Sequence, residues 1–358
     1  MAGATAAGRF AGLLLLFLAT LLTACSRPEV FHRESYVFGT QVSVAVYGED
    51  PAQADAAIGA VLREFDRLHR AYHAWEPSEL TALNAAIARG ETATVSDELA
   101  AMLADAQRIA ATGDELFDPA LGKLIELWGF HTDTFVPRLP DPARVQALLA
   151  ARPRMADLVI DGNRVASRNP AVQLDLGGYA KGYALDRAAV ILRAQGVANA
   201  LINISGNLLA LGSKGGQPWR IGIQDPRPGQ PPLATLPLYD GEAIGTSGDY
   251  QRYFDLDGRR YSHLLDPRTG EPARGTHSLT VLVTPASITG AMAQESAGTL
   301  SDAASKPAFI AGDDWRPMTR RFNVDHALRV AEDGRVEVTK ALRARLQFSG
   351  DVKPAVVE

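Results

Sequence analysis

One stretch of the sequence decides the fold class, and it reads Leu174-Asp175-Leu176-Gly177-Gly178-Tyr179-Ala180-Lys181-Gly182-Tyr183-Ala184-Leu185-Asp186-Arg187. It places an acidic residue and a glycine pair between a predicted strand and a predicted helix. The glycines allow a ligand to approach backbone N–H groups at the helix start, where a phosphate is favoured, and Lys181 adds a positive charge. A tight strand-to-helix turn with a solvated lysine explains the same residues. The stretch alone leaves both interpretations open.

The segments on both sides of this stretch mix helices with short strands. Valines at 37, 42, 44 and 46 keep a period near two, which predicts a strand with one buried face. Ser96 is the predicted N-cap of a helix. The fold class is therefore α+β, with mixed sheets packed with helices. The predicted elements are strands over residues 36–47, 200–211 and 279–284, helices over 52–74, 97–111 and 143–151, and a hairpin at Asp161-Gly162-Asn163.

The N-terminal residues are typical of an exported lipoprotein. Arg9 precedes an apolar run, Leu13 to Leu22, and Thr23-Ala24-Cys25 follows. That order predicts a signal peptide over residues 1–24, since the run is shorter than the roughly 20 residues that span a bilayer. Cys25 is the only cysteine, so we expect it to carry a lipid. An ordinary cleaved signal with an incidental cysteine is the alternative.

Charge and length limit the remaining possibilities. The formal net charge of the 358 residues is −5 and no basic run appears, so nucleic acid is not an expected partner. The length after the signal suits one large domain or two closely packed ones. We expect a lipidated N-terminus and linker over 25–35, a folded body over 36–350 with an internal boundary near 137–150, and a C-terminal tail over 351–358.

Two hydroxyl-rich stretches, residues 244–250 and 261–270, are predicted to be loops that flank a hairpin at Asp257-Gly258. The first contains Ser247, and the second contains His263 and Asp266. His263 is the candidate base for a hydroxyl nucleophile, and Asp266 is the candidate residue that orients it. An isolated histidine beside an aromatic residue is more often structural, but its neighbours favour a catalytic role here.

Asp302 is the candidate ligand for a hard cation such as Mg²⁺. It lies in the stretch Ser301-Asp302-Ala303-Ala304-Ser305-Lys306-Pro307, whose small residues permit close packing. Without further context, an aspartate there is more typical of a charge at a helix N-terminus than of a ligand.

In their order along the chain, these stretches resemble the ApbE family, the periplasmic FAD:protein FMN transferases. Each similar block is weak alone, but the ordered set is specific and covers nearly all of the chain after the signal. The blocks are Phe38-Gly39-Thr40, Ser78-Glu79-Leu80 with Asn84, Phe117-Asp118-Pro119, Trp128-Gly129-Phe130, and residues 175–187, 203–212, 219–226, 246–250 and 262–270.

The resemblance implies two closely associated parts with FAD in a crevice between them and Mg²⁺ on its pyrophosphate. It implies transfer of FMN to a Thr or Ser hydroxyl of an acceptor flavoprotein, with release of AMP. The metal and Lys181 would neutralise the developing charge, and His263 would activate the hydroxyl. By position, the resemblance assigns FAD contacts to Phe38, Trp75, Asp118, Asp175, Lys181, Ser247 and Leu264, and metal contacts to Gly178 and Asp302. For Phe38 and Trp75, packing in the core is the alternative.

Two positions depart from the family pattern. Ser205-Gly206-Asn207 stands where the family commonly has Gly-Gly-Asp, which removes a negative charge. Lys306 stands where a Thr or Asp usually helps to hold the metal, and an ammonium group cannot ligate Mg²⁺. Either the metal has fewer protein ligands, or Lys306 supplies the positive charge itself. With a lysine at this position, the block resembles that of the family branch that accompanies nitrous oxide reductase.

Four functions follow as hypotheses from these residues. They are the FMN transferase, an FAD-binding lipoprotein without transfer activity, an FAD pyrophosphatase that gives FMN and AMP, and a structural envelope lipoprotein without a ligand. With a lipid at Cys25, the protein would face the periplasm from the bacterial cell envelope. Its acceptor would then be a membrane or periplasmic flavoprotein.

Overall fold

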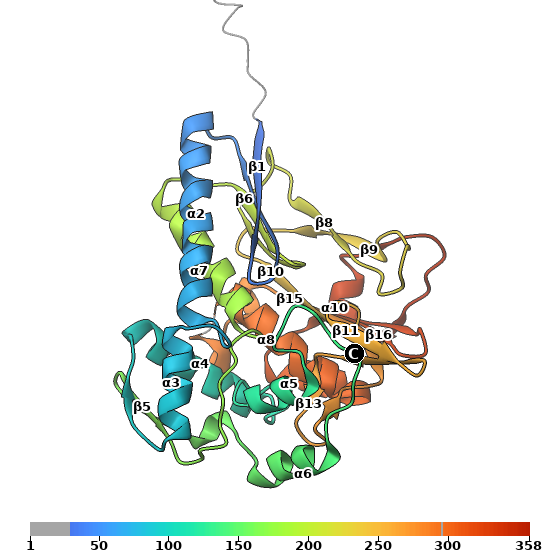
Figure 1. Ribbon diagram of the computed structural model, residues 1–358. Helices are drawn as coiled ribbons and strands as arrows, with labels where there is room; N and C mark the ends of the chain where they lie inside the picture. The colour runs from blue at the N-terminus through green and yellow to red at the C-terminus, as the bar shows by residue number, and fades with distance from the viewer. Residues whose placement is uncertain (1–28, 295) are drawn as a thin grey trace, which may run out of the picture.

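The computed structural model describes residues 29–294 and 296–358, and a nine-stranded sheet forms the centre of this part (Figure 1). Neighbouring strands are antiparallel, except for a parallel pair at the C-terminal edge. In spatial order the strands are β1 (Val30–Val37), β2 (Thr40–Tyr47), β6 (Ala200–Ile204), β7 (Asn207–Leu211), β10 (Ala243–Gly248), β15 (Thr276–Val283), β16 (His326–Ala331), β17 (Val336–Thr339) and β19 (Ala355–Val357).

Both faces of this sheet are covered. Helices α2 (Pro51–Tyr72), α7 (Ala180–Ala194) and α8 (Ala297–Ile310) pack on one face, where Val42, Val44 and Val46 are fully buried. On the other face Ile244 and Leu282 pack with residues of a second, three-stranded sheet. The elements on that side are β8 (Trp219–Ile223), β9 (Ala234–Leu238), β18 (Gln347–Phe348) and α10 (Lys340–Arg343).

A second part lies beside the lower ends of α2 and α7 (Figure 1). Some of its apolar residues, such as Leu83 and Leu103, continue the core of the large sheet, and others form a separate cluster. Trp128, Phe130, Phe254 and Tyr261 stack there, with ring centroids 5.2–6.5 Å apart. The structure therefore confirms an α+β protein with mixed sheets and helices. The remaining elements are α3 (Glu79–Ala88), β3 (Ala93–Thr94), α4 (Asp97–Thr112), α5 (Gly122–Trp128), α6 (Pro142–Ala151), β4 (Leu158–Asp161), β5 (Arg164–Ser167), β11 (Tyr253–Leu256), β12 (Arg259–Ser262), β13 (Leu265–Asp266), β14 (Glu271–Pro272) and α9 (Trp315–Arg321).

Several elements agree with the sequence-based predictions. Helices α2, α4 and α6 begin and end within a few residues of the predicted bounds. The Ser96 side chain caps α4 as expected, since its hydroxyl accepts the Leu99 N–H at 3.2 Å. The hairpins at Asp161-Gly162-Asn163 and Asp257-Gly258 are also present.

The single strands predicted over residues 36–47 and 200–211 are wrong, because each stretch contains a turn between two antiparallel strands, β1–β2 and β6–β7. Phe38 and Gly39 have φ angles of 58° and 67°, and they turn the chain between β1 and β2. Two central residues with positive φ suit a tight hairpin turn. The dipeptides that usually predict such a turn are Asn-Gly and Asp-Gly, and Phe-Gly is not one of them. β1 begins at Val30, inside the predicted linker, and β19 lies inside the predicted tail.

Two local expectations also differ from the structure. Residues 246–248 were expected in a loop but belong to β10, at the centre of the large sheet. The segment before Gly177 is not a strand, because its only ladder contact is an isolated bridge between Gln173 and Leu121. Within residues 29–294 and 296–358, no helix is long and apolar enough to cross a bilayer. Cys25 and the predicted signal lie outside the described residues.

Candidate functional site

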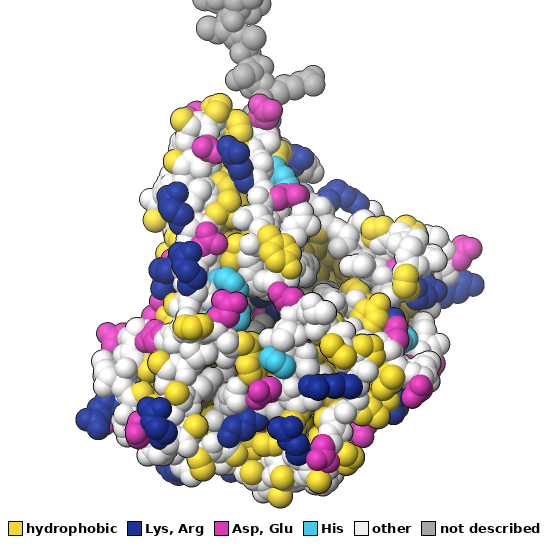
Figure 2. Space-filling view, viewed as in Figure 1, with side chains coloured by type: hydrophobic (Ala, Val, Ile, Leu, Met, Phe, Trp, Pro, Cys, Tyr) yellow, Lys and Arg dark blue, Asp and Glu magenta, His cyan; other side chains and the backbone are white. Residues whose placement is uncertain are grey.

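A cleft of about 720 Å³ opens where the β1–β2 turn, the end of α2 and the start of α7 meet the second part. This volume is within the roughly 300–1,000 Å³ of typical small-molecule sites. Figure 2 shows the molecule hollowed near the middle of this face, with histidine and acidic side chains gathered around the hollow. Of the residues singled out in the sequence, the cleft is lined by Phe38, Trp75, Asp118, Asp175, Gly178, Lys181, His263, Leu264 and Lys306.

Phe38 forms one wall of the cleft from a strained backbone position. Its left-handed conformation costs about 1–2 kcal/mol for a residue with a Cβ atom. Its ring lies 5.9 Å from that of Phe65 and 5.8 Å from that of His69. A bulky residue held at such a turn points to a function for its side chain.

Trp75 forms a second aromatic wall, and two neighbours hold it in place. Its indole N–H donates to Asp175 Oδ2 at 3.1 Å, and its ring lies 5.4 Å from that of His131. His73 follows the end of α2, and its Nδ1 accepts the backbone N–H groups of Trp75 and Glu76 at 3.1 and 2.9 Å. The indole is therefore oriented before any ligand binds.

The start of α7 supplies positive potential to the cleft. Asp175 accepts the Gly177 N–H at 2.7 Å, and Lys181 Nζ donates to the Gly177 carbonyl at 3.1 Å. A Cβ atom on Gly178 would lie 2.7 Å from Phe117 and 2.8 Å from Lys306, so only glycine fits there. The Ala180 and Gly182 N–H groups already donate within the protein, to the Leu176 carbonyl at 2.7 Å and to Asp302 Oδ2 at 2.9 Å. The helix dipole and the Lys181 ammonium group are therefore what favour a phosphate group here.

His263 lies on the wall of the same cleft as a neutral imidazole. Burial, with Arg252, Lys181 and Lys306 nearby, lowers the pKa of His263 to about 3. Its Nδ1 lies 3.1 Å from the Arg252 carbonyl, an acceptor, so the network assigns the proton to Nδ1 and a lone pair to Nε2. A bound pyrophosphate would raise this pKa, because negative charge favours the imidazolium.

The expected pairing of Asp266 with His263 does not occur. Arg268 holds the Asp266 carboxylate from two sides, with Nε 2.9 Å from Oδ1 and Nη2 2.7 Å from Oδ2. Asp266 does not line the cleft, and the group that orients His263 is the Arg252 carbonyl. A backbone carbonyl carries no residue-specific signal, so the sequence could not reveal it.

Ser247 is also outside the cleft lining. It is buried on β10, and its hydroxyl lies 2.8 Å from that of Ser305 on α8. The structure thus gives Ser247 a contact between strand and helix instead of the expected contact with FAD.

Lys306 lines the cleft and Asp302 does not, and the two side chains form a buried ion pair. Lys306 Nζ donates to Asp302 Oδ1 at 2.6 Å and to the Asp302 carbonyl at 2.8 Å. Asn207 Nδ2 donates to the same Oδ1 at 3.0 Å, and the Gly182 N–H donates to Oδ2 at 2.9 Å. The two departures from the family pattern, Asn207 and Lys306, therefore meet at one carboxylate.

Both partners of this pair are charged at neutral pH. Burial opposes ionisation of Asp302, but Lys306, Lys181 and the hydrogen bonds hold its pKa below the ordinary value. Burial lowers the pKa of Lys306 to about 8, although Asp302 acts in the opposite direction.

These residues do not fit a Mg²⁺ ion as they are arranged. Mg²⁺ requires oxygen ligands in near-octahedral geometry, and both Asp302 oxygens already accept hydrogen bonds, one of them from an ammonium group. Among the residues that the structure describes, no three His, Cys, Asp or Glu side chains are grouped to hold a metal ion.

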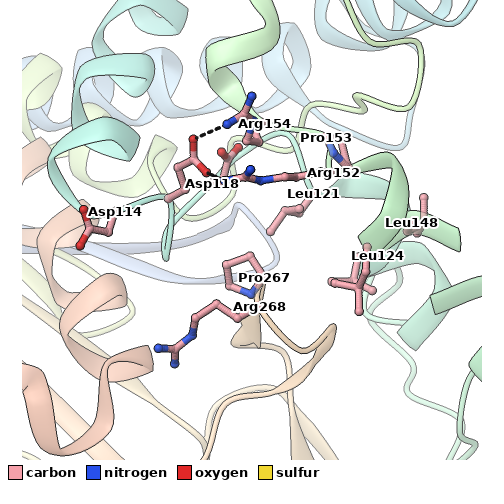
Figure 3. Close-up of a pocket in the computed structure, with 12 residues that line it drawn as sticks. Asp114, Asp118, Leu121, Leu124, Leu148, Arg152, Pro153, Arg154, Pro267 and Arg268 are labelled. Carbon is pink, nitrogen blue, oxygen red and sulfur yellow. Dashed lines mark hydrogen bonds and ion pairs between the residues drawn. The ribbon is translucent and has the colours of Figure 1, made fainter. Parts of the chain in front are cut away.

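Asp118 separates the cleft from a smaller cavity of about 180 Å³. Figure 3 shows this cavity with Asp118, Arg152 and Arg154 on one side and Arg268 on the other. Arg152 and Arg154 each pair with Glu115 at 3.2 Å, Arg154 also pairs with Asp157 at 3.7 Å, and Arg268 pairs with Asp266. Three carboxylates thus balance these three positive charges within the protein. The larger cleft is therefore the better candidate for an anionic ligand.

Sequence reasoning missed several residues that line the cleft, among them His69, His73, His131 and Arg252. The spacing of His69 and His73 was a usable signal, because residues i and i+4 share one face of a helix. Arg252 donates to the carbonyls of Phe130 and Thr132 at 3.2 and 3.0 Å, so it ties the start of the β11–β12 hairpin to the segment that follows α5. Nothing in its sequence context indicated that contact.

Comparisons with known proteins agree on one family. The model of the ApbE family matches residues 38–326. A Rhodobacter capsulatus protein named FAD:protein FMN transferase is 43% identical over 338 residues, which are 94% of this chain and 62% of that protein. The chain thus spans less than two thirds of that relative. A Klebsiella pneumoniae (strain 342) protein of the same name is 34% identical over 69% of this chain and 75% of its own length.

Solved structures give the same result. The ApbE protein of Thermotoga maritima superposes with a TM-score of 0.77 at 32% identity, covering 88% of this chain and 99% of its own. The apo form of the Pseudomonas stutzeri flavinyl transferase ApbE gives 0.74 at 29% identity, covering 89% and 97%.

Proposed function

Because the chain belongs to the ApbE family, we propose that it is an FAD:protein FMN transferase. The observation that supports this most strongly is the composition of one cleft. It contains two aromatic walls, a helix N-terminus with Lys181, and a neutral histidine. These are the groups needed to hold a flavin, bind a pyrophosphate and accept a proton from a hydroxyl group.

The reaction is a phosphoryl transfer to an alcohol. The oxygen of a Thr or Ser hydroxyl on the acceptor attacks the phosphorus on the FMN side of the pyrophosphate. A new phosphoester bond forms, the bond from this phosphorus to the bridging oxygen breaks, and AMP leaves. The hydroxyl proton passes to His263, so FAD and the acceptor alcohol yield FMN-labelled acceptor and AMP.

Each group in the cleft has a part in this step. Phe38 and Trp75 pack against the flavin, because aromatic rings stack well on a large planar ligand. Lys181 and the positive end of the α7 dipole bind the pyrophosphate. The lone pair on His263 Nε2 accepts the proton, a contribution of about 10²–10⁴ in rate.

The place of action and the acceptor belong to the same proposal. A lipid on Cys25 would tether the enzyme to the envelope on the periplasmic side, and a membrane or periplasmic flavoprotein would be the acceptor. Lys306 supports the assignment of this protein to the family branch that accompanies nitrous oxide reductase. Incorporation of radiolabelled palmitate into the native protein, but not into Cys25→Ser, tests the anchor.

The test of transfer is covalent labelling of an acceptor. The protein is incubated with FAD and fragments of candidate flavoproteins, and flavin fluorescence of the denatured acceptor is measured with released AMP. We expect equal amounts of both products, a loss of at least 100-fold in His263→Ala, and no loss in His32→Ala, a half-exposed histidine on β1.

Other products would favour the other functions. Free FMN formed at the same rate without any acceptor indicates a pyrophosphatase. Tight FAD binding with neither AMP release nor labelling indicates a binding protein.

A further inference from the structure

The geometry points to Lys306 as a protein-borne cation that occupies the place of Mg²⁺ beside the pyrophosphate, so that FMN transfer proceeds without a divalent metal. This inference deepens the proposed function and rests on it for the identity of the ligand. It assigns Lys306 as a further catalytic residue of the cleft.

The position of the ammonium group is fixed by the protein. Lys306 Nζ donates one hydrogen bond to Asp302 Oδ1 at 2.6 Å and another to the Asp302 carbonyl at 2.8 Å. The side chain is only 10% exposed, yet it lines the cleft. An ammonium group has three donors, and the third has no acceptor among the residues that the structure describes. That donor is available to a ligand oxygen in the cleft.

The charge around Lys306 is balanced without a metal. Asp302 carries one negative charge, Lys306 one positive charge and Asn207 none. The Asn207 amide donates to the oxygen that Lys306 also contacts, which a carboxylate at 207 could not do. With an aspartate at 207 and a threonine at 306, the pattern implied by the resemblance, two adjacent carboxylates would carry two negative charges and would require a divalent cation.

Close helix packing keeps this arrangement rigid. A Cβ atom on Gly182 would lie 2.4 Å from the Gly298 carbonyl oxygen and 2.7 Å from Asp302 Cβ, so α7 and α8 touch at this point. The contact lets the Gly182 N–H reach Asp302 Oδ2 at 2.9 Å. Asp302 therefore receives three donors from three elements, α7, β7 and α8.

The role of Lys306 in the reaction is electrostatic. Its third N–H donates to an oxygen of the pyrophosphate, and its charge stabilises the negative charge that develops on the departing AMP phosphate. Lys306 neither gains nor loses a proton in the step. Gly178 allows this approach, because a Cβ atom there would collide with the Lys306 side chain at 2.8 Å.

The test measures metal binding, FAD affinity and transfer on the native protein and on charge-pattern variants. Mn²⁺ serves as the probe for the Mg²⁺ site, and its binding in the presence of FAD is followed by electron paramagnetic resonance. FAD affinity is measured by quenching of tryptophan fluorescence, in a chelator and in Mg²⁺. The variants are Lys306→Thr, Lys306→Thr with Asn207→Asp, and the exposed control Lys340→Thr on α10.

We expect the native protein to bind no stoichiometric Mn²⁺, and its FAD affinity and transfer rate to change less than twofold between chelator and Mg²⁺. The double variant should bind one Mn²⁺ per chain, with FAD affinity at least tenfold higher in Mg²⁺ than in chelator. Lys340→Thr should behave as the native protein. One Mn²⁺ bound to the native protein, or a tenfold loss of its FAD affinity in chelator, would overturn the inference.

Failure of the inference and failure of the proposed function give different results. Acceptor labelling that occurs only with Mg²⁺ retains the transferase and rejects the role of Lys306. A different result rejects the transferase and retains Lys306 as the ligand-binding cation. In that case the native protein binds FAD without metal and the double variant gains metal dependence, but no acceptor is labelled. The native measurement needs no variant, so it decides the question even where Lys306→Thr fails to fold.

Discussion

Replacement of Lys306 by methionine is the most informative test of stability, because the two side chains have similar length and only one is charged. The change leaves Asp302 buried with its hydrogen bonds from Asn207 and Gly182, but without an opposite charge 2.6 Å away. At that distance the gross attraction is about 6 kcal/mol for an effective dielectric constant of about 20. The removal of the lysine desolvation cost offsets part of this.

The expected net loss in Lys306→Met is about 3–5 kcal/mol, the usual cost of leaving one member of a buried pair unpaired. With an unfolding entropy of about 2 cal/mol/K per residue over ~330 residues, the midpoint temperature should fall by about 5–8 °C. The double variant Lys306→Met with Asp302→Asn should recover most of this loss, because no buried charge remains.

Thermal unfolding followed by circular dichroism, together with a double-mutant cycle, measures these values. A midpoint for Lys306→Met within about 1 °C of the native value, with no gain in the double variant, would refute the argument that the ammonium group balances Asp302.

Three further predictions concern single residues. Phe38→Asn should weaken FAD binding at least fivefold in fluorescence titrations with little change in melting temperature, because asparagine tolerates the left-handed turn but lacks the ring; unchanged affinity would remove Phe38 from the flavin site. Gly182→Ala should lower the free energy of unfolding by about 1–3 kcal/mol, because the added Cβ forces α7 away from Gly298. The control Gly59→Ala on α2, where the added Cβ contacts only the end of the Arg63 side chain, should leave that free energy unchanged or raise it. Denaturant unfolding measures both variants. Burial raises the pKa of Asp118 from 3.8 to about 7, so the folded state binds this proton more tightly and stability should fall by up to about 4 kcal/mol as the pH rises from about 4 to about 7. The melting temperature of Asp118→Asn should therefore rise relative to the native protein over that range, and a difference independent of pH would contradict the prediction.

The sequence could predict those parts of the fold that depend on local signals. Helix α4 follows from Ser96 and its apolar spacing, and the β4–β5 hairpin follows from Asp161-Gly162-Asn163. The β1–β2 turn was not predictable, because Phe38 holds a conformation that Asn or Gly would normally occupy. Its strain is balanced by packing against Phe65, which is distant in the sequence.

The same distinction applies to the site. Residues carried by the resemblance, such as Trp75, Lys181 and His263, do line one cleft. The partner of Asp266 could not be predicted. Arg268 binds both oxygens of its carboxylate, and sequence spacing does not show whether Arg268 or His263 contacts Asp266. Nor could the sequence show that Asn207 and Lys306 meet, since they lie on a strand and a helix nearly a hundred residues apart.

Intact-mass measurement of an acceptor fragment after incubation with FAD in a chelator tests both FMN transfer and its independence of metal. The native protein should add the mass of FMN less one water to a single Thr or Ser, with one AMP released per fragment, and His263→Ala should add nothing in the same time. An acceptor that gains no mass while AMP accumulates, or a gain that appears only after Mg²⁺ is supplied, would contradict it.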